Sequence, residues 1–430
     1  MDDTGSNDAD VLVPGRGQPF RDATLICGTE DASSSDERGR ILYVGSTSDL
    51  PTKYTKLSAV KVPVLMPGLW DAHVHYFGEA EPNLDHLAIL RPALAGMRAA
   101  RDVAATLNAG YTSVREVGGY GIDFSQAIEE GWMPGPHIYS AGAPISQTAG
   151  HGDLHTQPIE LMHHKIAQGL PLHLADGVEE AIKAVRLQIR RGAKVIKLCA
   201  TGGVMSRIDS PRAAQFTPAE LRAMVEEATR TNMYVAAHAH GTEGIIAALK
   251  AGVMTIEHGS YLTKEAIGLM KEKGAILVAT RLIQVSGIRH PENMAEESYR
   301  KILTVERANK KSYQEAIQAG VKCALGSDLG ISNVPSDFKH GMNGHEFYLA
   351  VDAGMTPLQA IEAGTANGPD TLGPQAPLSG QLKENYDADF IALTEDPIRN
   401  IEVLAQPNKI THVWKGGRCF KSPGKPITIH

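Results

Sequence analysis

Two histidines separated by a single residue, His73 and His75, follow an apolar run at residues 62–70. Successive side chains of a β-strand point to opposite faces, so both imidazoles lie on one face if this segment is a strand, and Val74 lies on the other. Two imidazoles on one face can hold a metal ion between them. A chain of 430 residues with 17 histidines also contains such pairs by chance, so this pair alone does not establish a metal site.

More residues with metal-binding groups stand near the ends of short β-type runs further along the chain: Lys197, His238, His258 and Asp328. The active sites of (β/α)8 barrels lie at the C-terminal ends of the strands. Imidazole nitrogens and carboxylate oxygens are ligands that zinc accepts. Six candidate ligands at five strand ends therefore predict a metal centre in such a barrel.

A lysine needs a chemical change before it can bind a cation. In residues 193–199, strand alternation places Lys194 and Lys197 on opposite faces, so one of them is interior. An interior ammonium is costly unless it is paired or chemically changed. A lysine amine held neutral can take up carbon dioxide and become an anionic carbamate, whose two oxygens can bridge two cations. Lys197, near the strand end, is our candidate for this role.

Each candidate also has an ordinary structural interpretation. Lys197 can extend from the barrel mouth into solvent, and Asp328 can cap a helix. His238 and His258 can be hydrogen-bonded core histidines. Each interpretation is acceptable by itself, but the coincidence of six polar residues at five strand ends favours the metal centre.

Alternating strand and helix patterns predict the barrel itself. We expect strands at residues 69–75, 111–117, 137–141, 193–199, 233–238, 253–258, 275–280 and 321–328, the eight that a closed βα barrel needs. Helical patterns lie between them at residues 177–191, 218–232, 241–251, 264–273 and 298–319, with Thr217 as an N-cap.

Both ends of the chain have a different pattern. Residues 1–9 are polar enough to predict a disordered leader, and residues 30–38 a flexible insertion between β-type runs at 23–27 and 41–44. Further β-type runs follow at 390–393 and 411–414, the second before a turn at 415–418. We expect the two ends to form a small β-sandwich, with domain parts at residues 1–67, 68–366 and 367–430.

Composition narrows the possible partners. The net charge is −7 and 42% of residues are hydrophobic, with no basic cluster that would favour nucleic acid or an anionic membrane. The four cysteines are widely spaced, without a Cys-x-x-Cys pair. The start of the chain has no secretory pattern, and no apolar stretch of about 18 residues occurs. We expect a cytoplasmic protein that acts on small molecules.

The motifs resemble those of the metal-dependent amidohydrolase superfamily, over a region from about residue 10 to the C-terminus. The matching segments are residues 66–75, 194–197, 237–241, 256–259 and 325–328, with a closing pattern at 388–393 and 413–417. Residues 147–153, 189–193 and 202–206 resemble the branch of fungal ochratoxinase and the Xaa-Pro dipeptidases, which is related to imidazolonepropionase.

The resemblance implies a binuclear zinc site. Its six ligand positions are all filled here, by His73, His75 and Asp328 for the more buried ion, by His238 and His258 for the other, and by carboxylated Lys197 as the bridge. A water bridging two zinc ions loses its proton near neutral pH and becomes the nucleophile. Asp328 is the expected catalytic residue that accepts this proton and delivers it to the departing amine.

Further residues are candidates for the substrate. His240 lies on the same strand face as His238, nearer the mouth, and would stabilise the oxyanion or the substrate; a hydrogen-bonded mouth histidine is the alternative. A substrate carboxylate would need a cation. The candidate substrate-binding residues are Arg207, Arg212, Arg281, Tyr261 and His151.

The sequence thus predicts a distorted (β/α)8 barrel that acts as a zinc amidohydrolase on a linear amide, in an N-acyl amino acid or dipeptide-like substrate. One alternative is a cyclic-amide hydrolase of the imidazolonepropionase type, and another is a non-catalytic, metal-free scaffold. Relatives in this branch form homo-oligomers, so we expect one here.

Overall fold

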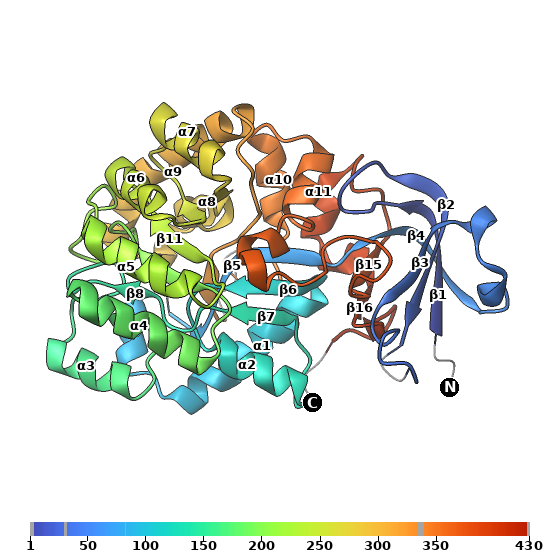
Figure 1. Cartoon of the computed structure of the whole chain (residues 1–430), viewed down its shortest axis with the longest axis horizontal. Helices are drawn as coiled ribbons and strands as arrows, with labels where there is room; N and C mark the ends of the chain where they lie inside the picture. Colours follow the sequence, from blue (N-terminus) through green and yellow to red (C-terminus); the bar gives the residue numbers. More distant parts are fainter. Residues whose placement is uncertain (1–3, 30–31, 82, 333–338, 428–430) are drawn as a thin grey trace.

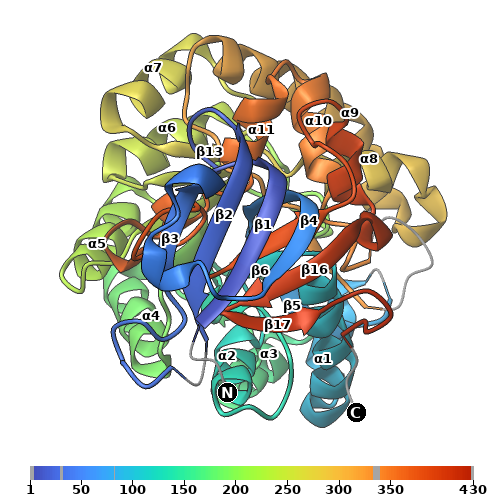
Figure 2. The same cartoon turned by 90° about the vertical axis from the view of Figure 1, so that its right-hand side faces the viewer.

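The computed structural model describes residues 4–29, 32–81, 83–332 and 339–427. A sheet built from both ends of the chain stands beside a set of parallel strands, here called the ring strands, that is surrounded by helices (Figure 1). Figure 2 looks onto this sheet, with the helices around and behind it.

Within the described residues, seven strands form the terminal sheet, in the order β17-β16-β15-β4-β1-β2-β3. They are β1 (Thr4–Leu12), β2 (Phe20–Gly28), β3 (Ile41–Ser46), β4 (Ala59–Pro67), β15 (Phe390–Leu393), β16 (Ile410–Lys415) and β17 (Arg418–Lys421). β1 pairs antiparallel with β2 and parallel with β4, and β15 pairs antiparallel with β4. The predicted pairing of the two chain ends is therefore confirmed.

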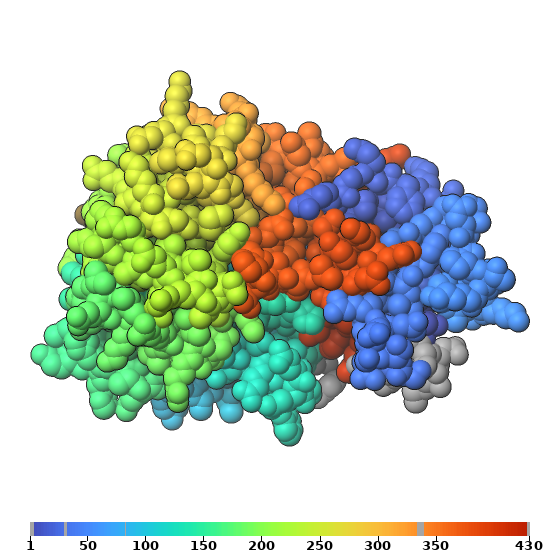
Figure 3. All heavy atoms as spheres, in the orientation of Figure 1, coloured from blue at the N-terminus to red at the C-terminus, as the bar shows by residue number. Residues whose placement is uncertain are grey.

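Apolar side chains bury one face of this sheet, among them Leu25, Leu65, Phe390 and Trp414. In the space-filling view, the N-terminal residues in blue lie against C-terminal residues in red-orange (Figure 3). The strands belong to a single sheet, so the two-layered sandwich stays a prediction.

The expected disordered leader is wrong for residues 4–9, which belong to β1; residues 1–3 lie outside the described residues. β1 has backbone partners on both sides, β2 and β4, which stabilise a strand whose polar sequence did not indicate one. Of the expected flexible insertion, residues 30 and 31 are not described. Ala32 is buried, and Arg38 donates to its carbonyl oxygen at 3.1 Å.

The ring strands form two parallel sheets, in the orders β14-β5-β6-β7 and β13-β12-β11-β10-β8-β9. Their bounds are β5 (Leu69–Glu79), β6 (Tyr111–Glu116), β7 (His137–Ser140), β8 (Ile145–Ser146), β9 (His173–Leu174), β10 (Ile196–Cys199), β11 (Val235–Ala239), β12 (Thr255–His258), β13 (Ile276–Val278) and β14 (Leu329–Ile331). The backbone N–H of Lys194, just before β10, donates to Ser140 of β7 at 2.8 Å. On the other side, the segment 322–325 accepts from one strand of each sheet: Leu277 donates to Lys322 at 2.9 Å and Ala72 to Leu325 at 2.8 Å.

The helices are α1 (Pro92–Asn108), α2 (Gly121–Glu129), α3 (Ile159–Ala167), α4 (Gly177–Arg191), α5 (Pro218–Thr229), α6 (Thr242–Ala251), α7 (Lys264–Lys273), α8 (Arg281–Arg289), α9 (Glu296–Gln318), α10 (His345–Asp352) and α11 (Pro357–Ala363). Short 3-10 helices are η1 (Thr47–Asp49), η2 (Thr52–Tyr54), η3 (Leu84–Ala88), η4 (Pro291–Asn293), η5 (Pro369–Gln375), η6 (Ile401–Ala405) and η7 (Pro407–Lys409). Among the described residues, no helix is long and apolar enough to cross a membrane.

Local signals explain the helices that the sequence predicted. Thr217 accepts from the backbone of Glu220 and Glu220 bonds back to Thr217, a capping box that starts α5. α4 ends at Gly192, whose φ of 101° suits a residue without a side chain. α4 and α7 have their predicted bounds.

The expected strand at residues 321–328 is not formed. Cys323 makes only an isolated bridge with Leu277, and β14 begins at Leu329, beside β5. Gly326 lies against β5 so closely that a Cβ there would be 2.7 Å from that of His73. Asp328 has a φ of 59°, which interrupts an extended chain. At Asp328, which approaches His73 and His75, the chain therefore bends and does not pair as a strand.

Candidate metal centre

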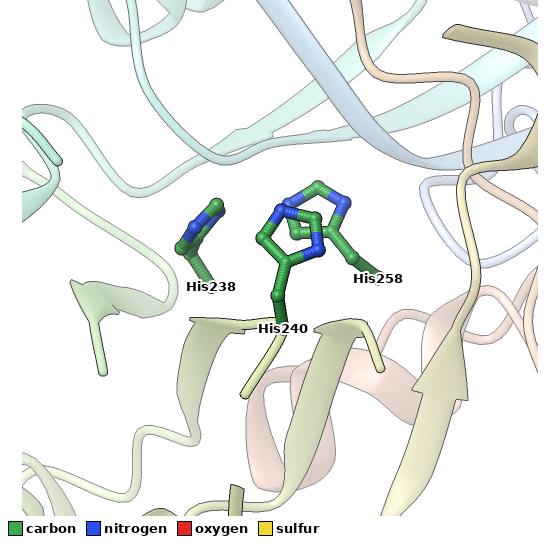
Figure 4. A group of neighbouring side chains, drawn as sticks. All are labelled: His238, His240 and His258. Atoms are coloured by element: carbon green, nitrogen blue, oxygen red, sulfur yellow. The ribbon is translucent and has the colours of Figure 1, made fainter. Parts of the chain in front are cut away.

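Side chains that can bind metal ions form two groups, one along β5 and directly before β14, the other at the C-terminal ends of β11 and β12. Within each group, the candidate ligand atoms lie within 4.8 Å of one another; one group is His73, His75 and Asp328, the other His238, His240 and His258. Figure 4 shows the three imidazoles of the second group rising from the strand ends into a common space.

The first group forms as the strand alternation predicted. The Nε2 atom of His75 lies 3.1 Å from Oδ1 of Asp328, and that of His73 lies 3.3 Å from the same oxygen. The backbone N–H of Asp328 donates to the carbonyl of His73 at 2.7 Å. Burial by itself would raise the pKa of Asp328, but the neighbouring His73 and His75 rings hold that pKa well below its ordinary value. Asp328 is therefore an ionised carboxylate, able to bind a cation.

Hydrogen bonds on the outer side of two rings determine which nitrogen faces the centre. The Nδ1 atom of His75 lies 2.8 Å from the carbonyl of Gly118, and Nε2 of His238 lies 3.0 Å from the carbonyl of Gly202. A carbonyl oxygen only accepts, so these nitrogens are protonated and the other nitrogen of each neutral ring has a free lone pair. The lone pairs are Nε2 of His75 and Nδ1 of His238.

His73 is held by a buried ion pair. Its Nδ1 lies 2.7 Å from Oε2 of Glu257, and Nη2 of Arg115 lies 2.8 Å from both oxygens of that carboxylate. Burial opposes ionisation of Glu257, but Arg115 and then His73 lower its pKa below the ordinary value. An ionised carboxylate only accepts hydrogen bonds, so His73 is protonated on Nδ1 and offers Nε2 to a metal.

The second group consists of neutral imidazoles. The pKa values of His238 and His258 lie well below the ordinary value, first because of burial and then because of neighbouring histidines. Nδ1 of His258 lies 2.7 Å from Oγ1 of Thr280, and both residues have a positive φ, of 69° and 46°. Such backbone strain is typical of functional sites. Neutral imidazole is the form that binds metals.

His240, expected nearer the mouth than His238, belongs to the same group of candidate ligand atoms as His238 and His258. Its Nδ1 lies 2.7 Å from Oγ of Ser260, and burial lowers its pKa to about 3. A role toward the oxyanion or substrate stays a prediction.

Lys197 is buried, with 3% of its surface exposed, and lines a cavity that both groups also line. Its amine makes no hydrogen bond or ion pair with another residue in the described part of the chain. Burial lowers its pKa, although Glu257 and Asp328 act in the opposite direction. A buried lysine with a depressed pKa is the form that can react with carbon dioxide.

A cavity of about 160 Å³ adjoins both groups. Much of its wall is apolar, with side chains that include Phe77, Leu172, Val204, Met294 and Ile302. Of the predicted substrate-binding residues, His151 lines this cavity and stacks on His238, with ring centroids 4.0 Å apart.

The three predicted arginines are engaged elsewhere. Arg207 pairs with Asp85 at 2.9 Å, and the Arg212 guanidinium lies over the Tyr261 ring at 3.9 Å. Arg281 is buried and pairs with Glu306 at 2.5 Å. Among the described residues that line the cavity, none is an arginine, and Tyr261 does not line it either. Their substrate contacts stay predictions.

Sequence reasoning did not identify Glu257 or Arg115 as functional residues. One signal was available: Glu257 directly precedes His258 in a short strand whose side chains are all buried. A buried carboxylate requires a cation or several donors. Which residue supplies the cation depends on how β6 and β12 face each other across the ring.

The parallel strands and the candidate ligands beside them fit a hydrolase of the amidohydrolase class. The model of the Amidohydrolase family matches residues 64–419, and the chain belongs to this family. It is therefore an enzyme, a hydrolase that acts on carbon–nitrogen bonds.

The relatives lie in the branch that the sequence motifs indicated. The chain is 48% identical to ochratoxinase from Aspergillus niger, over 97% of this chain and 86% of the relative. The crystal structure of A. niger ochratoxinase matches with a TM-score of 0.90 and 45% identity, covering 98% of this chain and 96% of that one. A prolidase complexed with N-methylphosphonate-L-proline matches with a TM-score of 0.88 and 30% identity, covering 97% and 100%.

Proposed function

We propose that the protein is a zinc-dependent amidohydrolase that cleaves a linear amide bond in an N-acyl amino acid or dipeptide-like substrate. The observation that supports this best is the set of ring nitrogens in the two groups. His73, His75 and His238 each use the outer nitrogen as a hydrogen-bond donor, which leaves a lone pair for a metal. Asp328 adds an ionised carboxylate to them.

The residues fit two zinc ions. His73, His75 and Asp328 would hold one, and His238 and His258 the other. Nitrogen and oxygen donors without thiolates suit zinc. Lys197, buried and without a partner among the described residues, would become a carbamate by losing a proton and adding carbon dioxide, and would bridge the ions.

Two zinc ions would supply an activated water and polarise the scissile carbonyl. Asp328 contributes the proton transfer, because its ionised carboxylate can accept a proton and return it to the departing nitrogen, which leaves poorly as an anion. His240 lies at the same cavity and can donate a hydrogen bond to the carbonyl oxygen as negative charge develops there.

The substrate class rests on the relatives and on the cavity. One relative is named ochratoxinase, and a prolidase neighbour is complexed with a phosphonate of L-proline. The apolar wall around the ligands suits an apolar acyl group or side chain. Arg207, Arg212 and Arg281 remain candidates for a substrate carboxylate, and would reach it only after exchanging their present partners.

Several structural features belong to this proposal. The two parallel sheets would form a closed, distorted (β/α)8 barrel at residues 68–366, and residues 1–67 and 367–430 a β-sandwich domain. A homo-oligomer and a cytoplasmic location stay predictions.

A hydrolysis screen with defined zinc content tests the function. N-acyl amino acids, Xaa-Pro dipeptides, ochratoxin-type amides and a cyclic amide should be compared, and a linear amide is expected to be the best substrate. Ring opening without linear cleavage would favour the imidazolonepropionase type. Normal folding with no bound metal and no turnover would favour the scaffold.

A further inference from the structure

The peptide group between Gly202 and Gly203 lies directly behind the second group of candidate ligands. Its carbonyl oxygen, on Gly202, lies 3.0 Å from Nε2 of His238, and its N–H, on Gly203, donates to Oδ2 of Asp209 at 3.0 Å. A trans peptide is planar, so its C=O and N–H point in opposite directions. The two hydrogen bonds therefore place His238 and Asp209 at opposite ends of one peptide group.

The carboxylate reaches this peptide because residue 202 is a glycine. A Cβ at Gly202 would lie 2.7 Å from Oδ2 of Asp209 and 2.3 Å from the carbonyl oxygen of Ser210. The carbonyl oxygen of Gly202 also accepts from Oγ1 of Thr201 at 2.8 Å. The orientation of the peptide is thus set by an acceptor at its N–H and by two donors at its oxygen.

The carboxylate of Asp209 is itself held in place, with its side chain only 5% exposed. Nζ of Lys301, on α9, lies 3.3 Å from Oδ1 of Asp209, and the hydroxyl of Ser206 donates to the same oxygen. Lys301 also donates to the carbonyl oxygens of Ser206 and Gly203, at 2.7 and 3.0 Å. These contacts attach both the carboxylate and the peptide behind His238 to α9.

Asp209 is an anion at this position. Burial opposes its ionisation, but His151, Ser206 and Lys301 lower its pKa below the ordinary value. Hydrogen bonds in a chain polarise one another, so an anion at the N–H end of a peptide makes the carbonyl oxygen a stronger acceptor. A stronger acceptor at Nε2–H raises the basicity of the other ring nitrogen, Nδ1 of His238, which has the free lone pair.

We propose that Asp209 is a positioning residue for the second metal ion, the one that His238 and His258 would hold. It acts through the 202–203 peptide, which keeps the proton of His238 on Nε2 and its lone pair on Nδ1. The proposal rests on the zinc centre of the proposed function. It gives His238 the kind of support that Glu257 gives His73, with one peptide group inserted between carboxylate and ring.

Zinc affinity tests this role. Competition with a chelator, in full-length wild type and Asp209→Asn, gives one dissociation constant for each ion. In the variant, the single amide oxygen cannot serve both Lys301 and the N–H of Gly203, so the new NH₂ group faces one of these donors. The dissociation constant of one ion should rise about tenfold, the lower end of the usual effect of a partner behind a ligand histidine. The constant of the other ion should not change.

Asp85→Asn is the matched control. Asp85 also anchors the loop at residues 202–209, but it contacts Arg207 at 2.9 Å and not the peptide behind His238. Both zinc constants should equal those of wild type in this variant. The control therefore separates loosening of the loop from loss of the peptide contact.

Lys301→Met provides a second variant if Asp209→Asn does not fold. It withdraws the cation that holds Asp209 and the carbonyl of Gly203, so it should weaken binding of the same single ion. Lys310→Met, at a lysine on the same helix that pairs with Asp352 at 2.7 Å, should leave both ions bound as in wild type.

The proton on Nε2 of His238 gives a readout of the hydrogen bond itself. In zinc-loaded protein with ¹⁵N-labelled histidine, this proton is assigned by its loss in His238→Gln. We expect it to resonate far downfield and to exchange slowly with water in wild type and in Asp85→Asn. In Asp209→Asn it should shift upfield and exchange faster, because the carbonyl acceptor is weaker and less well aligned.

The outcomes separate this proposal from the proposed function. Zinc constants that change in neither Asp209→Asn nor Lys301→Met would overturn it, and so would an equal loss of affinity in Asp85→Asn. If the wild type binds no zinc, the proposed function fails and the ring tautomer decides the relay. The ¹⁵N shifts of His238 should then show Nε2–H in wild type and a mixture of both tautomers in Asp209→Asn; the same tautomer in both proteins would overturn the relay.

Discussion

Glu257 accepts a hydrogen bond from Nδ1 of His73 at 2.7 Å, while both of its oxygens lie 2.8 Å from Nη2 of Arg115. All three side chains are buried. The ion pair fixes which nitrogen of His73 faces Asp328, although neither Glu257 nor Arg115 would touch a metal. Such outer partners of a ligand imidazole set its orientation and basicity.

Glu257→Gln should weaken zinc binding about 10- to 100-fold, the usual effect of losing the carboxylate behind a ligand histidine. It should also destabilise the fold by about 3–5 kcal/mol, because Arg115 loses its only buried anion among the described residues. Zinc affinity by competition with a chelator and unfolding by denaturant measure the two effects. Glu81→Gln, at an exposed glutamate that also lines the cavity, is the control. Unchanged affinity would show that the carboxylate does not orient His73.

The purified protein should bind about two zinc ions per chain, and His73→Ala or His258→Ala should abolish activity through loss of metal. Elemental analysis of each variant gives the metal content. His164→Ala, at an exposed histidine on α3, should keep both ions. Full activity at less than one metal per two chains would contradict a binuclear site.

Asp328→Asn should keep most of the fold and lower kcat by about 10²- to 10⁴-fold, because an amide fills the space of the carboxylate but cannot transfer its proton. Some loss of metal is expected as well, so kcat must be normalised to the zinc content. Turnover near the wild-type value in fully loaded protein would remove Asp328 from the proton transfer.

If Lys197 is carboxylated, the native mass spectrum should show a chain that is heavier than the unmodified chain by one carbon dioxide. Acidification should remove this added mass. Lys197→Ala should lose the metal pair, and acetate added with zinc should restore part of the activity by occupying the vacated space. Lys197→Arg should not respond, since its guanidinium stays charged and fills that space. If Lys197→Ala has wild-type activity without added acetate, no carbamate bridge is needed.

The buried carboxyl group of Glu346 should make the stability of the fold depend on pH. Its carboxyl group is buried on α10 and accepts from the backbone of Leu282 at 2.5 Å. Burial, together with the charge of Asp71, raises its pKa from 4.5 to about 8. The folded state therefore binds this proton more tightly, so its contribution to stability is complete below pH 4.5 and is lost as the pH rises through about 8.

Glu346→Gln mimics the protonated group and should remove this loss. Relative to wild type, the variant should gain roughly 2–4 kcal/mol of unfolding free energy between pH 6 and pH 9. Denaturant unfolding at the two pH values measures the difference. Glu402→Gln, at an exposed glutamate, should behave like wild type. If the unfolding free energies of wild type and Glu346→Gln change with pH in parallel, the pKa of Glu346 is not raised.

The sequence by itself predicted several helices, most of the ring strands and the candidate ligands, because these predictions depend on local periodicity. Alternation along a strand was enough to place His73 and His75 on one face, and the parallel direction of the ring strands brings their C-terminal ends together. Capping residues and glycines mark helix ends: Thr217 precedes the start of α5, and Gly192 follows the end of α4.

Only the tertiary structure decided what lies behind and beside those candidate ligands. Arg115 and Glu257 are 142 positions apart, and Lys301 lies 92 positions from Asp209, so no local pattern reports either pair. The same is true of residues 4–9, where pairing with strands on both sides outweighs a polar sequence. The bend at Asp328 replaces the expected strand, because the close approach of Gly326 to His73 is a contact between distant segments. Ring tautomers, buried ion pairs and edge pairing depend on partners that chain folding brings together from far apart in sequence.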